Sequence, residues 1–423
     1  MGRVTNDLPQ IPTAADVETA ATRLASTIRP TPLEHDTRLS ERSGGQVWLK
    51  REDLQPVRSY KIRGAYNLIS QLDDRQRAAG VICASAGNHG QGVAFSCAKL
   101  GIDARIFVPR TTPRQKRDRM LALGRGRVEM VVVGDTYDEA SAAANAEAAE
   151  TGAVLVPAFD DPRTIAGQGT LAAEVVADLG GAPDVLLVPV GGGGMLAGCL
   201  LWFAEHHPDT RIVAVEPASA ACLDAAVRHG GPITLESIDT FVDGAAVRRA
   251  GALTTAVAAE HCKEFVQVPE GQICTEMLDL YQTDGIIAEP AGAMASAVIG
   301  RQVQLQPGEV CVAIVSGGNN DVSRYAEIIE RSLVHEGRKH YFLVNFPQEP
   351  GALRRFLNEV LGPDDDIALF EYAKRSDRET GPALVGIELG SPDDLAGLLD
   401  RMERSPMQVE QVPADSAFYR FLV

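Results

Sequence analysis

The sequence predicts an α/β protein built on open parallel sheets covered by helices, with a smaller α+β module at its C-terminal end. Two observations predict this fold class. Short apolar runs alternate with helix-length segments through residues 1–330, which is the pattern of a parallel sheet. From residue 339 on, the order of the expected elements changes to βαββαβ. A chain of 423 residues is also too long for a single hydrophobic core, so two or three domains are expected.

The elements of the first part follow from apolar runs bounded by glycine, proline or polar residues. We expect strands at residues 47–50, 81–84, 104–108, 128–133, 154–156, 185–190, 212–215, 264–268 and 310–315. We expect helices at residues 14–27, 65–79, 91–100, 137–150, 169–179, 195–204 and 292–299. These elements would form one unit with two open parallel-sheet lobes, the smaller at about 54–155.

The C-terminal module is expected at residues 339–423, after a polar linker at 331–338. Its strands are expected at residues 341–346, 367–372, 383–389 and 409–412. Two apolar sets at the helical spacing i, i+3, i+4, i+7 lie between them: Leu353, Phe356, Leu357 and Val360, then Leu395, Leu398, Leu399 and Met402. The order predicts a ferredoxin-like sheet.

The charge of the chain excludes two classes of partner. A formal net charge of −17 argues against nucleic acid and against an anionic membrane, because both would be repelled. The one basic run, residues 110–119, is read as a solvated helix start after Thr111-Thr112-Pro113.

Cysteine usage and the absence of targeting signals indicate a cytoplasmic protein. The seven cysteines are an odd number without C-x-x-C spacing, so we expect buried thiols in a reducing compartment, with no disulfide frame and no metal site. Residues 1–10 are polar and lack the apolar core of a signal peptide. The uncharged stretch between Asp184 and Glu205 is long enough to cross a bilayer, but Pro189 and four glycines favour a strand, a loop and a helix.

Lys61 is the candidate for covalent chemistry. It lies in Ser59-Tyr60-Lys61-Ile62-Arg63-Gly64, a turn that we expect just ahead of an apolar helix. The chain has seven lysines against 33 arginines. Arginine serves as well as lysine on a surface, but not where a deprotonatable amine must form a Schiff base. An ordinary surface lysine is the alternative interpretation.

A glycine-rich junction follows the expected strand 185–190. Absent side chains let a ligand approach the backbone, and successive amides at the start of the next helix can bind a phosphate. The residues concerned are Gly191, Gly192, Gly193, Gly194 and Met195. A flexible linker is the alternative, but linkers are not normally flanked by a buried strand and an apolar helix. The spacing matches neither nucleotide-binding glycine motif.

Two further strand-to-helix junctions carry polar residues. The amides of the first could hold a carboxylate, and its members are Ser85, Ala86, Gly87, Asn88, His89 and Gly90. His89 is a possible general base or a structural hydrogen-bonder. The other junction, Ser316-Gly317-Gly318-Asn319, places a hydroxyl where it could meet a cofactor or cap a helix.

These motifs together resemble one enzyme family. Ser-Tyr-Lys-Ile-Arg-Gly-Ala, Ser-Ala-Gly-Asn-His-Gly, the glycine run, Glu289-Pro290-Ala291-Gly292-Ala293 and Ser-Gly-Gly-Asn occur in that order. The chain resembles pyridoxal-phosphate (PLP) enzymes of the tryptophan-synthase-β type (fold type II), most closely the biosynthetic threonine dehydratases (threonine ammonia-lyases), which are carbon–nitrogen lyases. The resemblance implies an activity that converts L-threonine to 2-oxobutanoate and ammonia in isoleucine biosynthesis.

The resemblance also implies roles for the candidate residues. Lys61 would hold pyridoxal phosphate as a Schiff base and later remove the α-proton of the substrate. Asn88 would bond the ring hydroxyl, Gly191 to Met195 the phosphate, and Ser316 the ring nitrogen, which a serine does not force to stay protonated. The loop from Ser85 to His89 would hold the substrate carboxylate. Glu289 would lie near the ring or the leaving group, and Asp243-Gly244 resembles another active-site segment or is a plain turn.

The last module resembles the ACT-like regulatory domain of the same dehydratases, in a single copy. This resemblance implies feedback by isoleucine, opposed by valine, and a homotetramer. A purely structural dimerisation module is the alternative. Two rival functions stay open: a serine dehydratase or β-replacement enzyme of the same fold, and a non-catalytic amino-acid sensor.

Overall fold

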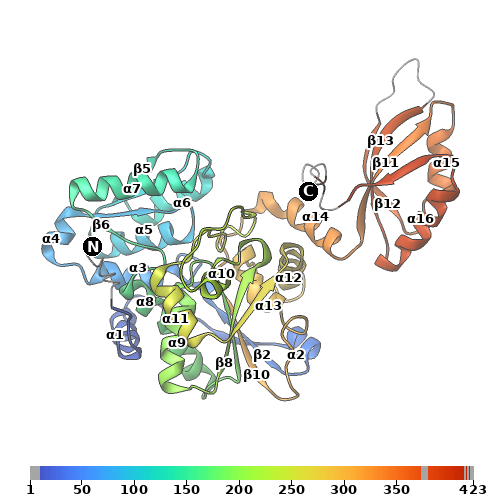
Figure 1. Ribbon diagram of the computed structural model, residues 1–423. Coiled ribbons are helices and arrows are strands. Elements are labelled where there is room, and N and C mark those ends of the chain that lie inside the picture. The colour runs from blue at the N-terminus through green and yellow to red at the C-terminus, as the bar shows by residue number, and fades with distance from the viewer. Residues whose placement is uncertain (1–9, 373–379, 414–415, 417–418, 420–423) are drawn as a thin grey trace, which may run out of the picture. The chain divides into compact units, whose positions relative to one another are not determined.

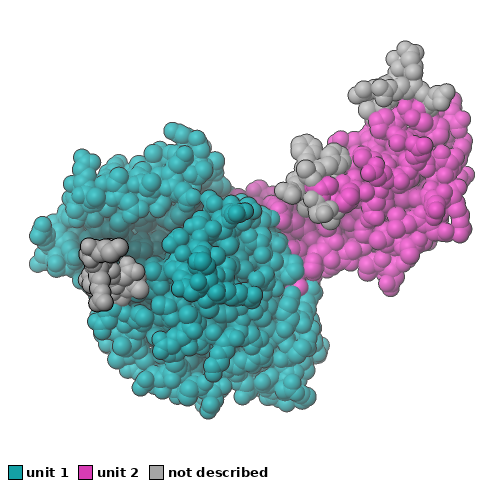
Figure 2. All heavy atoms as spheres, viewed as in Figure 1, with its two compact units in different colours: residues 1–270, 279–320 teal, residues 271–278, 321–423 magenta. Residues whose placement is uncertain are grey.

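The chain divides into two compact units (Figures 1 and 2). The computed structural model describes residues 10–372, 380–413, 416 and 419. Unit 1 comprises residues 1–270 and 279–320, and unit 2 comprises residues 271–278 and 321–423. Residues 1–9, which make up most of the polar N-terminal stretch, lie outside the described residues.

Unit 1 contains a six-stranded sheet in the order β1-β2-β10-β7-β8-β9. The strands are β1 (Leu33–Asp36), β2 (Gln46–Arg51), β10 (Val310–Val315), β7 (Val185–Pro189), β8 (Arg211–Pro217) and β9 (Glu264–Val268). Neighbours from β2 to β9 are parallel, and β1 pairs with β2 antiparallel. β7 is buried along its whole length, as its unbroken apolar run requires of a central parallel strand. All five strands predicted in this part are confirmed.

The second sheet of unit 1 has the order β5-β4-β3-β6 and is parallel throughout. Its strands are β5 (Val128–Val132), β4 (Ala104–Val108), β3 (Val81–Ala84) and β6 (Val154–Leu155). Successive side chains of β3 point to opposite faces, so Val81 and Cys83 join one apolar cluster and Ile82 joins another. The smaller lobe therefore has helices on both faces, as the sequence predicts.

Helices cover both sheets of unit 1. They are α1 (Ala14–Leu24), α2 (Thr37–Ser43), α3 (Lys61–Ser70), α4 (Asp74–Ala79), α5 (Asn88–Leu100), α6 (Arg114–Gly124), α7 (Tyr137–Thr151), α8 (Pro162–Leu179), α9 (Gly194–His206), α10 (Cys222–His229), α11 (Ala252–His261) and α13 (Pro290–Ala297). On the smaller sheet, α3, α5 and α6 cover one face and α7 the other. On the larger sheet, α1, α8, α9, α10 and α11 enclose one core, and α13 packs on β10 and β7.

The predicted helix 65–79 is wrong in two respects. It starts at Lys61 rather than after it, so the lysine belongs to the first turn of α3 and not to a preceding turn. It is also two helices, since α3 ends at Ser70 and α4 starts after Asp73. The Asp73 carboxylate accepts a hydrogen bond from the amide of Gln76, and the Gln76 side chain accepts one from the Asp73 amide. This capping box starts a new helix and breaks the old one.

Unit 2 has an antiparallel sheet in the order β12-β13-β11-β14. Its elements are α14 (Tyr325–His335), β11 (Lys339–Pro347), α15 (Ala352–Glu359), β12 (Asp366–Tyr372), β13 (Thr380–Glu388), α16 (Leu395–Arg404) and β14 (Gln408–Gln411). Phe342, Val344 and Phe346 of β11 pack with Phe356 and Leu398 of the two helices. The predicted ferredoxin-like order is confirmed. Part of the stretch expected to be a linker is helical, because α14 extends to His335.

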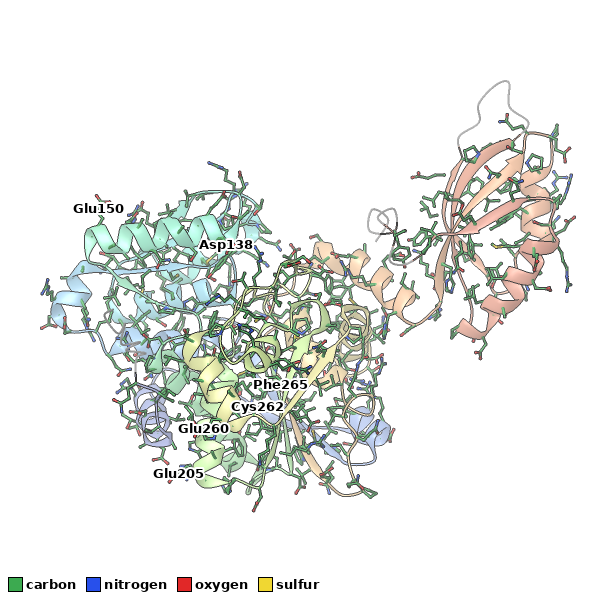
Figure 3. The ribbon with its side chains drawn as sticks, in the orientation of Figure 1. Asp138, Glu150, Glu205, Glu260, Cys262 and Phe265 are labelled. Carbon is green, nitrogen blue, oxygen red and sulfur yellow. The ribbon has the colours of Figure 1, made fainter. Side chains whose placement is uncertain are left out.

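Acidic side chains are exposed on the surface of unit 1. Acidic side chains lie exposed at the ends of three of its helices, as Figure 3 shows for Asp138, Glu150, Glu205 and Glu260. Among the described residues, no helix is both long enough and apolar enough to cross a membrane.

Candidate active site

The parallel strands bring the predicted site residues to one edge of the larger sheet. Because β2, β10 and β7 are parallel neighbours, the segments that follow them leave the sheet on the same side. Those segments carry Lys61, Ser316 and Gly191. The Tyr60 amide donates to the Ser316 carbonyl at 3.1 Å, and Ser59 forms an isolated antiparallel bridge with Gly317. The Lys61 turn is thereby attached to the end of β10.

The Lys61 amine lies at the start of α3, directed at the backbone of another segment. Its Nζ donates to the carbonyl of Ala158 at 3.1 Å, and Gln168 Nε2 donates to the same carbonyl at 3.1 Å. The side chain is half-buried. A half-buried amine with one backbone partner remains accessible to a small electrophile, as a Schiff-base lysine must be.

The glycine junction forms a backbone cradle at the N-terminus of α9. A Cβ at Gly192 would lie 2.3 Å from the Phe159 ring, and one at Gly194 would lie 2.5 Å from Gln168 Oε1. Gly193 adopts a left-handed conformation with φ of +88°. These positions therefore accept no larger residue, and the N–H groups of the first helical turn have no partner within the helix, so they can bind an anion. The Met195 side chain is buried in the core, so only its amide can contribute.

Some of the backbone amides in the junction after β3 already donate hydrogen bonds to a side chain of the same junction. The Ser85 hydroxyl accepts from the amides of Gly87 at 3.3 Å and Gly90 at 3.0 Å. Ala86, Gly87 and Asn88 are half-buried, and α5 starts at Asn88. Ser85 thus shapes the loop at the helix N-terminus. Binding of a carboxylate by this loop stays a prediction.

His89 hydrogen-bonds a backbone carbonyl in this geometry. Its Nε2 lies 2.7 Å from the Val156 carbonyl, which only accepts, so Nε2 carries a proton. Burial and the positive charge of Lys61 lower the pKa of His89 to about 4. The imidazole is therefore neutral at physiological pH, and it ties α5 to the end of β6.

Glu289 and Asn88 meet across the two lobes. Asn88 Nδ2 donates to Glu289 Oε1 at 2.5 Å, and Asn319 Nδ2 donates to Asn88 Oδ1 at 2.7 Å. Burial, with the charge of Asp243, raises the pKa of Glu289 to about 7. The structure thus brings two predicted site residues into contact, together with Asn319.

Ser316 and the Asp243 loop lie around the same point. The Ser316 hydroxyl is buried and donates to the Ala291 carbonyl at 3.2 Å. Asp243 forms an ion pair with Lys116. A Cβ at Gly244 would lie 2.8 Å from the Ala291 Cβ and 3.6 Å from Glu289 Oε1. The loop therefore belongs to the surroundings of Glu289 and is more than a plain surface turn.

Sequence reasoning missed three contributors. Ala158 acts through its carbonyl, which no side-chain pattern reveals. Gln168 stands in Gly167-Gln168-Gly169 and is fully buried, and its position between two helical glycines was an available signal. Arg63 is buried two residues after Lys61 and donates to Glu52 and Glu174. A charged residue inside an apolar helix indicated that a buried partner had to exist.

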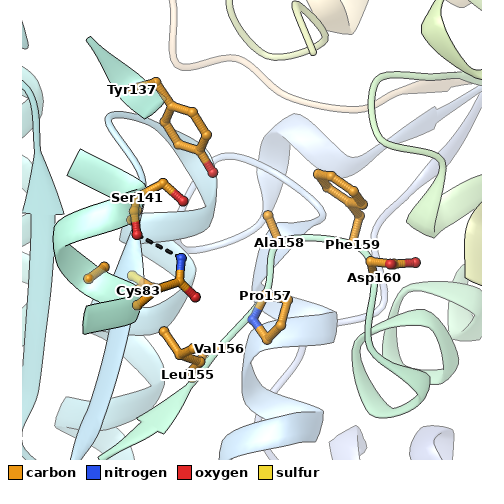
Figure 4. Close-up of a pocket in the computed structure, with 12 residues that line it drawn as sticks. Cys83, Tyr137, Ser141, Leu155, Val156, Pro157, Ala158, Phe159 and Asp160 are labelled. Atoms are coloured by element: carbon orange, nitrogen blue, oxygen red, sulfur yellow. Dashed lines mark hydrogen bonds between the residues drawn. The ribbon is translucent and has the colours of Figure 1, made fainter. Parts of the chain in front are cut away.

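A cavity of about 180 Å³ adjoins the site (Figure 4). Ala158 and Phe159 line it, and the same two residues contact Lys61 and the glycine cradle. None of the predicted cofactor-binding residues lines it. It is therefore a neighbour of the site and not the site itself.

Comparisons with known proteins decide the family. A family model described as pyridoxal-phosphate dependent enzyme matches residues 24–317, and one described as the C-terminal regulatory domain of threonine dehydratase matches residues 330–422. The chain is 57% identical over 411 residues to the biosynthetic L-threonine dehydratase IlvA of Mycobacterium tuberculosis (strain ATCC 25618 / H37Rv), covering 97% of this chain and 96% of the relative. The chain belongs to the biosynthetic threonine dehydratase family. Its cofactor is pyridoxal phosphate.

Other dehydratases and solved structures agree with membership of this family. The IlvA protein of Bacillus subtilis (strain 168) is 48% identical over 394 residues, 93% of each chain. The processed form of threonine deaminase isoform 2 from Solanum lycopersicum matches with a TM-score of 0.71 and 35% identity, covering 77% of this chain and 99% of that one. Maize serine racemase also reaches 0.71, at 29% identity, covering 77% and 99%. The fold is thus shared by enzymes with different reactions.

The residues present fit pyridoxal phosphate. The glycine cradle has the free amides and the open backbone that a phosphate needs, since a Cβ at Gly192 or Gly194 would clash. The Lys61 amine and the Ser316 hydroxyl lie at the same sheet edge as the cradle.

Proposed function

We propose that this protein is a threonine ammonia-lyase that converts L-threonine to 2-oxobutanoate and ammonia, the first step of isoleucine biosynthesis. The β-hydroxyl leaves as water, and one water re-enters when the product nitrogen is released as ammonia, so the net loss is ammonia. The observation that carries the proposal is the assembly of Lys61, the glycine cradle and Ser316 at one sheet edge in a chain 57% identical to a biosynthetic threonine dehydratase.

We assign the cofactor contacts to four elements of the chain. Bound pyridoxal phosphate supplies the electron sink for the electron pair left on the α-carbon. Lys61 Nζ would hold it through its aldehyde carbon, and the amides from Gly191 to Met195 would hold its phosphate. Asn88 would hold its ring oxygen, and the Ser316 hydroxyl would hold its ring nitrogen.

The substrate is held and deprotonated by two of these elements. The amides of the Ser85 to His89 loop, at the positive end of α5, hold the threonine carboxylate. Lys61 Nζ would take the α-proton of threonine. Neutral His89 remains bonded to Val156 and does not take part in proton transfer.

We further propose that the C-terminal module senses isoleucine, with valine opposing it. The catalytic domain is assigned to residues 1–330, with its smaller lobe at about 54–155, and the ACT-like domain to residues 339–423. Support comes from the family model of a regulatory domain at residues 330–422 and from the ferredoxin-like sheet. We expect a cytoplasmic homotetramer.

An absorbance spectrum with a coupled keto-acid assay tests the reaction. The purified protein should show the visible band of bound pyridoxal phosphate, and threonine should yield 2-oxobutanoate. Lys61→Ala should abolish the band and the product, whereas Lys99→Ala, at an exposed lysine of α5, should keep both. A band without keto acid would favour a β-replacement enzyme, and no band would favour a non-catalytic sensor.

Inhibition assays on the full-length protein test the regulatory proposal. Isoleucine should lower the rate at subsaturating threonine, and valine should restore it. Leucine serves as the control of similar volume. If none of the three changes the rate, the module is structural.

A further inference from the structure

The side chains of Asn88, Glu289 and Asn319 form a hydrogen-bonded cluster beside the proposed cofactor position. Asn319 Nδ2 donates to Asn88 Oδ1 and also to the Val57 carbonyl, at 2.7 and 2.8 Å. Asn88 Nδ2 donates to Glu289 Oε1 at 2.5 Å. The Asn319 backbone amide hydrogen-bonds Glu289 as well. Asn88 belongs to the smaller lobe, whereas Glu289 and Asn319 follow segments of the larger one.

The hydrogen bonds determine which way the Asn88 amide faces. An asparagine amide can adopt two orientations that exchange its oxygen and its nitrogen. The Val57 carbonyl only accepts, so Asn319 turns its nitrogen towards it, and the two N–H groups of Asn319 are both used as donors. Asn88 must therefore turn its nitrogen to Glu289 and its oxygen to Asn319. One N–H of Asn88 is left without a protein acceptor among the described residues.

The backbone next to this cluster leaves room for the contact between Glu289 and Asn88. A Cβ at Gly317 would lie 2.2 Å from Glu289 Oε1 and 3.3 Å from Asn88 Nδ2. Only glycine leaves room for the carboxylate to reach the amide. The Glu289 amide also donates a hydrogen bond to the Gly317 carbonyl at 3.1 Å. This bond holds the start of α13 next to Gly317.

We propose that Glu289 and Asn319 are positioning residues that fix the Asn88 amide in one orientation and so direct its remaining N–H to the ring oxygen of pyridoxal phosphate. The inference rests on the proposed function, because it takes Asn88 as the residue that meets the ring. It gives Glu289 a role that it exerts through Asn88 and not by direct proton transfer to the substrate.

A double-mutant cycle on cofactor binding tests this inference without using activity. Apoprotein is titrated with pyridoxal phosphate, and the absorbance of the saturated protein is recorded without threonine. Glu289→Met removes the acceptor and should weaken binding about tenfold, together with a shifted visible band. Glu289→Gln keeps an acceptor oxygen and should lose less affinity. In the Asn88→Ala background, Glu289→Met should change the affinity by less than about twofold.

Each outcome has a distinct meaning. A Glu289→Met variant with unchanged affinity and spectrum overturns the inference. So does a tenfold effect that persists in the Asn88→Ala background, because Glu289 would then act on the cofactor directly. If circular dichroism shows that Glu289→Met does not fold, the same cycle is run with Asn319→Ala, with the same expectations. Failure of the unmutated protein to bind pyridoxal phosphate would instead overturn the proposed function.

Discussion

The backbone amide of Tyr60 donates a hydrogen bond to the backbone carbonyl of Ser316. This bond joins the residue before the reactive lysine to the residue assigned to the cofactor ring nitrogen. Because only backbone atoms form it, the Ser316 side chain can be changed without detaching the Lys61 turn. The hydroxyl and the scaffold can therefore be tested separately.

Ser316→Ala should lower the rate of keto-acid formation about tenfold, because one hydrogen bond to the cofactor ring is lost. The free energy of unfolding should fall by only about 1 kcal/mol, for the lost bond to the Ala291 carbonyl. Ser70→Ala is the matched control, since Ser70 also donates to a backbone carbonyl, that of Asn67. Equal rates for the two variants would contradict the assignment of Ser316.

Gly192→Ala should weaken cofactor binding at least about tenfold, because the new methyl group would collide with the Phe159 ring. Titration of the apoprotein measures this. Gly181→Ala is the control, since a Cβ there meets nothing within 4 Å. Adding Phe159→Ala to Gly192→Ala should recover part of the affinity for the cofactor. If the glycine run were a flexible linker, Gly192→Ala would not weaken binding and Phe159→Ala would not restore it.

Arg63→Met should reduce the free energy of unfolding by about 3 to 5 kcal/mol, because the buried carboxylate of Glu52 loses its ion pair with Arg63 and keeps only neutral hydrogen-bond donors, Thr31 and Gln55. Urea unfolding of the apoprotein measures the change. Arg63→Met combined with Glu52→Gln should be more stable than Arg63→Met alone, since the unpaired charge is then removed. Additive losses would show that the pair is not energetically coupled.

Stability should depend on pH through Glu216, whose pKa burial raises to about 7. A carboxyl with a pKa raised on folding binds its proton more tightly in the folded state, so its contribution is greatest below about pH 4.5 and is lost as the pH rises to 7. Between pH 4.5 and pH 7, the free energy of unfolding of the unmutated protein should therefore fall by about 3 kcal/mol relative to that of Glu216→Gln. Parallel pH profiles would contradict the raised pKa.

L-Serine should be a slower substrate than L-threonine. The two differ by one methyl group, which an apolar pocket distinguishes by about 10- to 200-fold in kcat/KM. Both values should be measured on one preparation. A preference for serine would favour the serine dehydratase alternative.

The regular parts of the fold could be predicted because their signals are local. The strands β3 and β10 are unbroken apolar runs and β4 and β9 are largely apolar, and the predicted limits of all four match the structure. The strand β1 was missed because it has the sequence Leu33-Glu34-His35-Asp36, which is short and largely charged. The break between α3 and α4 was available in the sequence, since Asp73 and Gln76 have the spacing of a capping box.

The site could be predicted only as a set of motifs. Lys61, Asn88, Ser316 and the glycine run each follow from residue type and position. The contacts that join them depend on backbone atoms, such as the Ala158 carbonyl, or on side chains from distant segments, such as Asn319. Residue type does not reveal such partners, so they emerged only from the fold.

The position of β10 determines when the site can form during synthesis. This strand lies between β2 and β7, so the larger sheet stays open until residues 310–315 have left the ribosome. The turn that carries Lys61 acquires its anchor only then. Cofactor capture is therefore a late event in the production of this enzyme, and a chain that terminates before β10 carries the lysine without a site to use it.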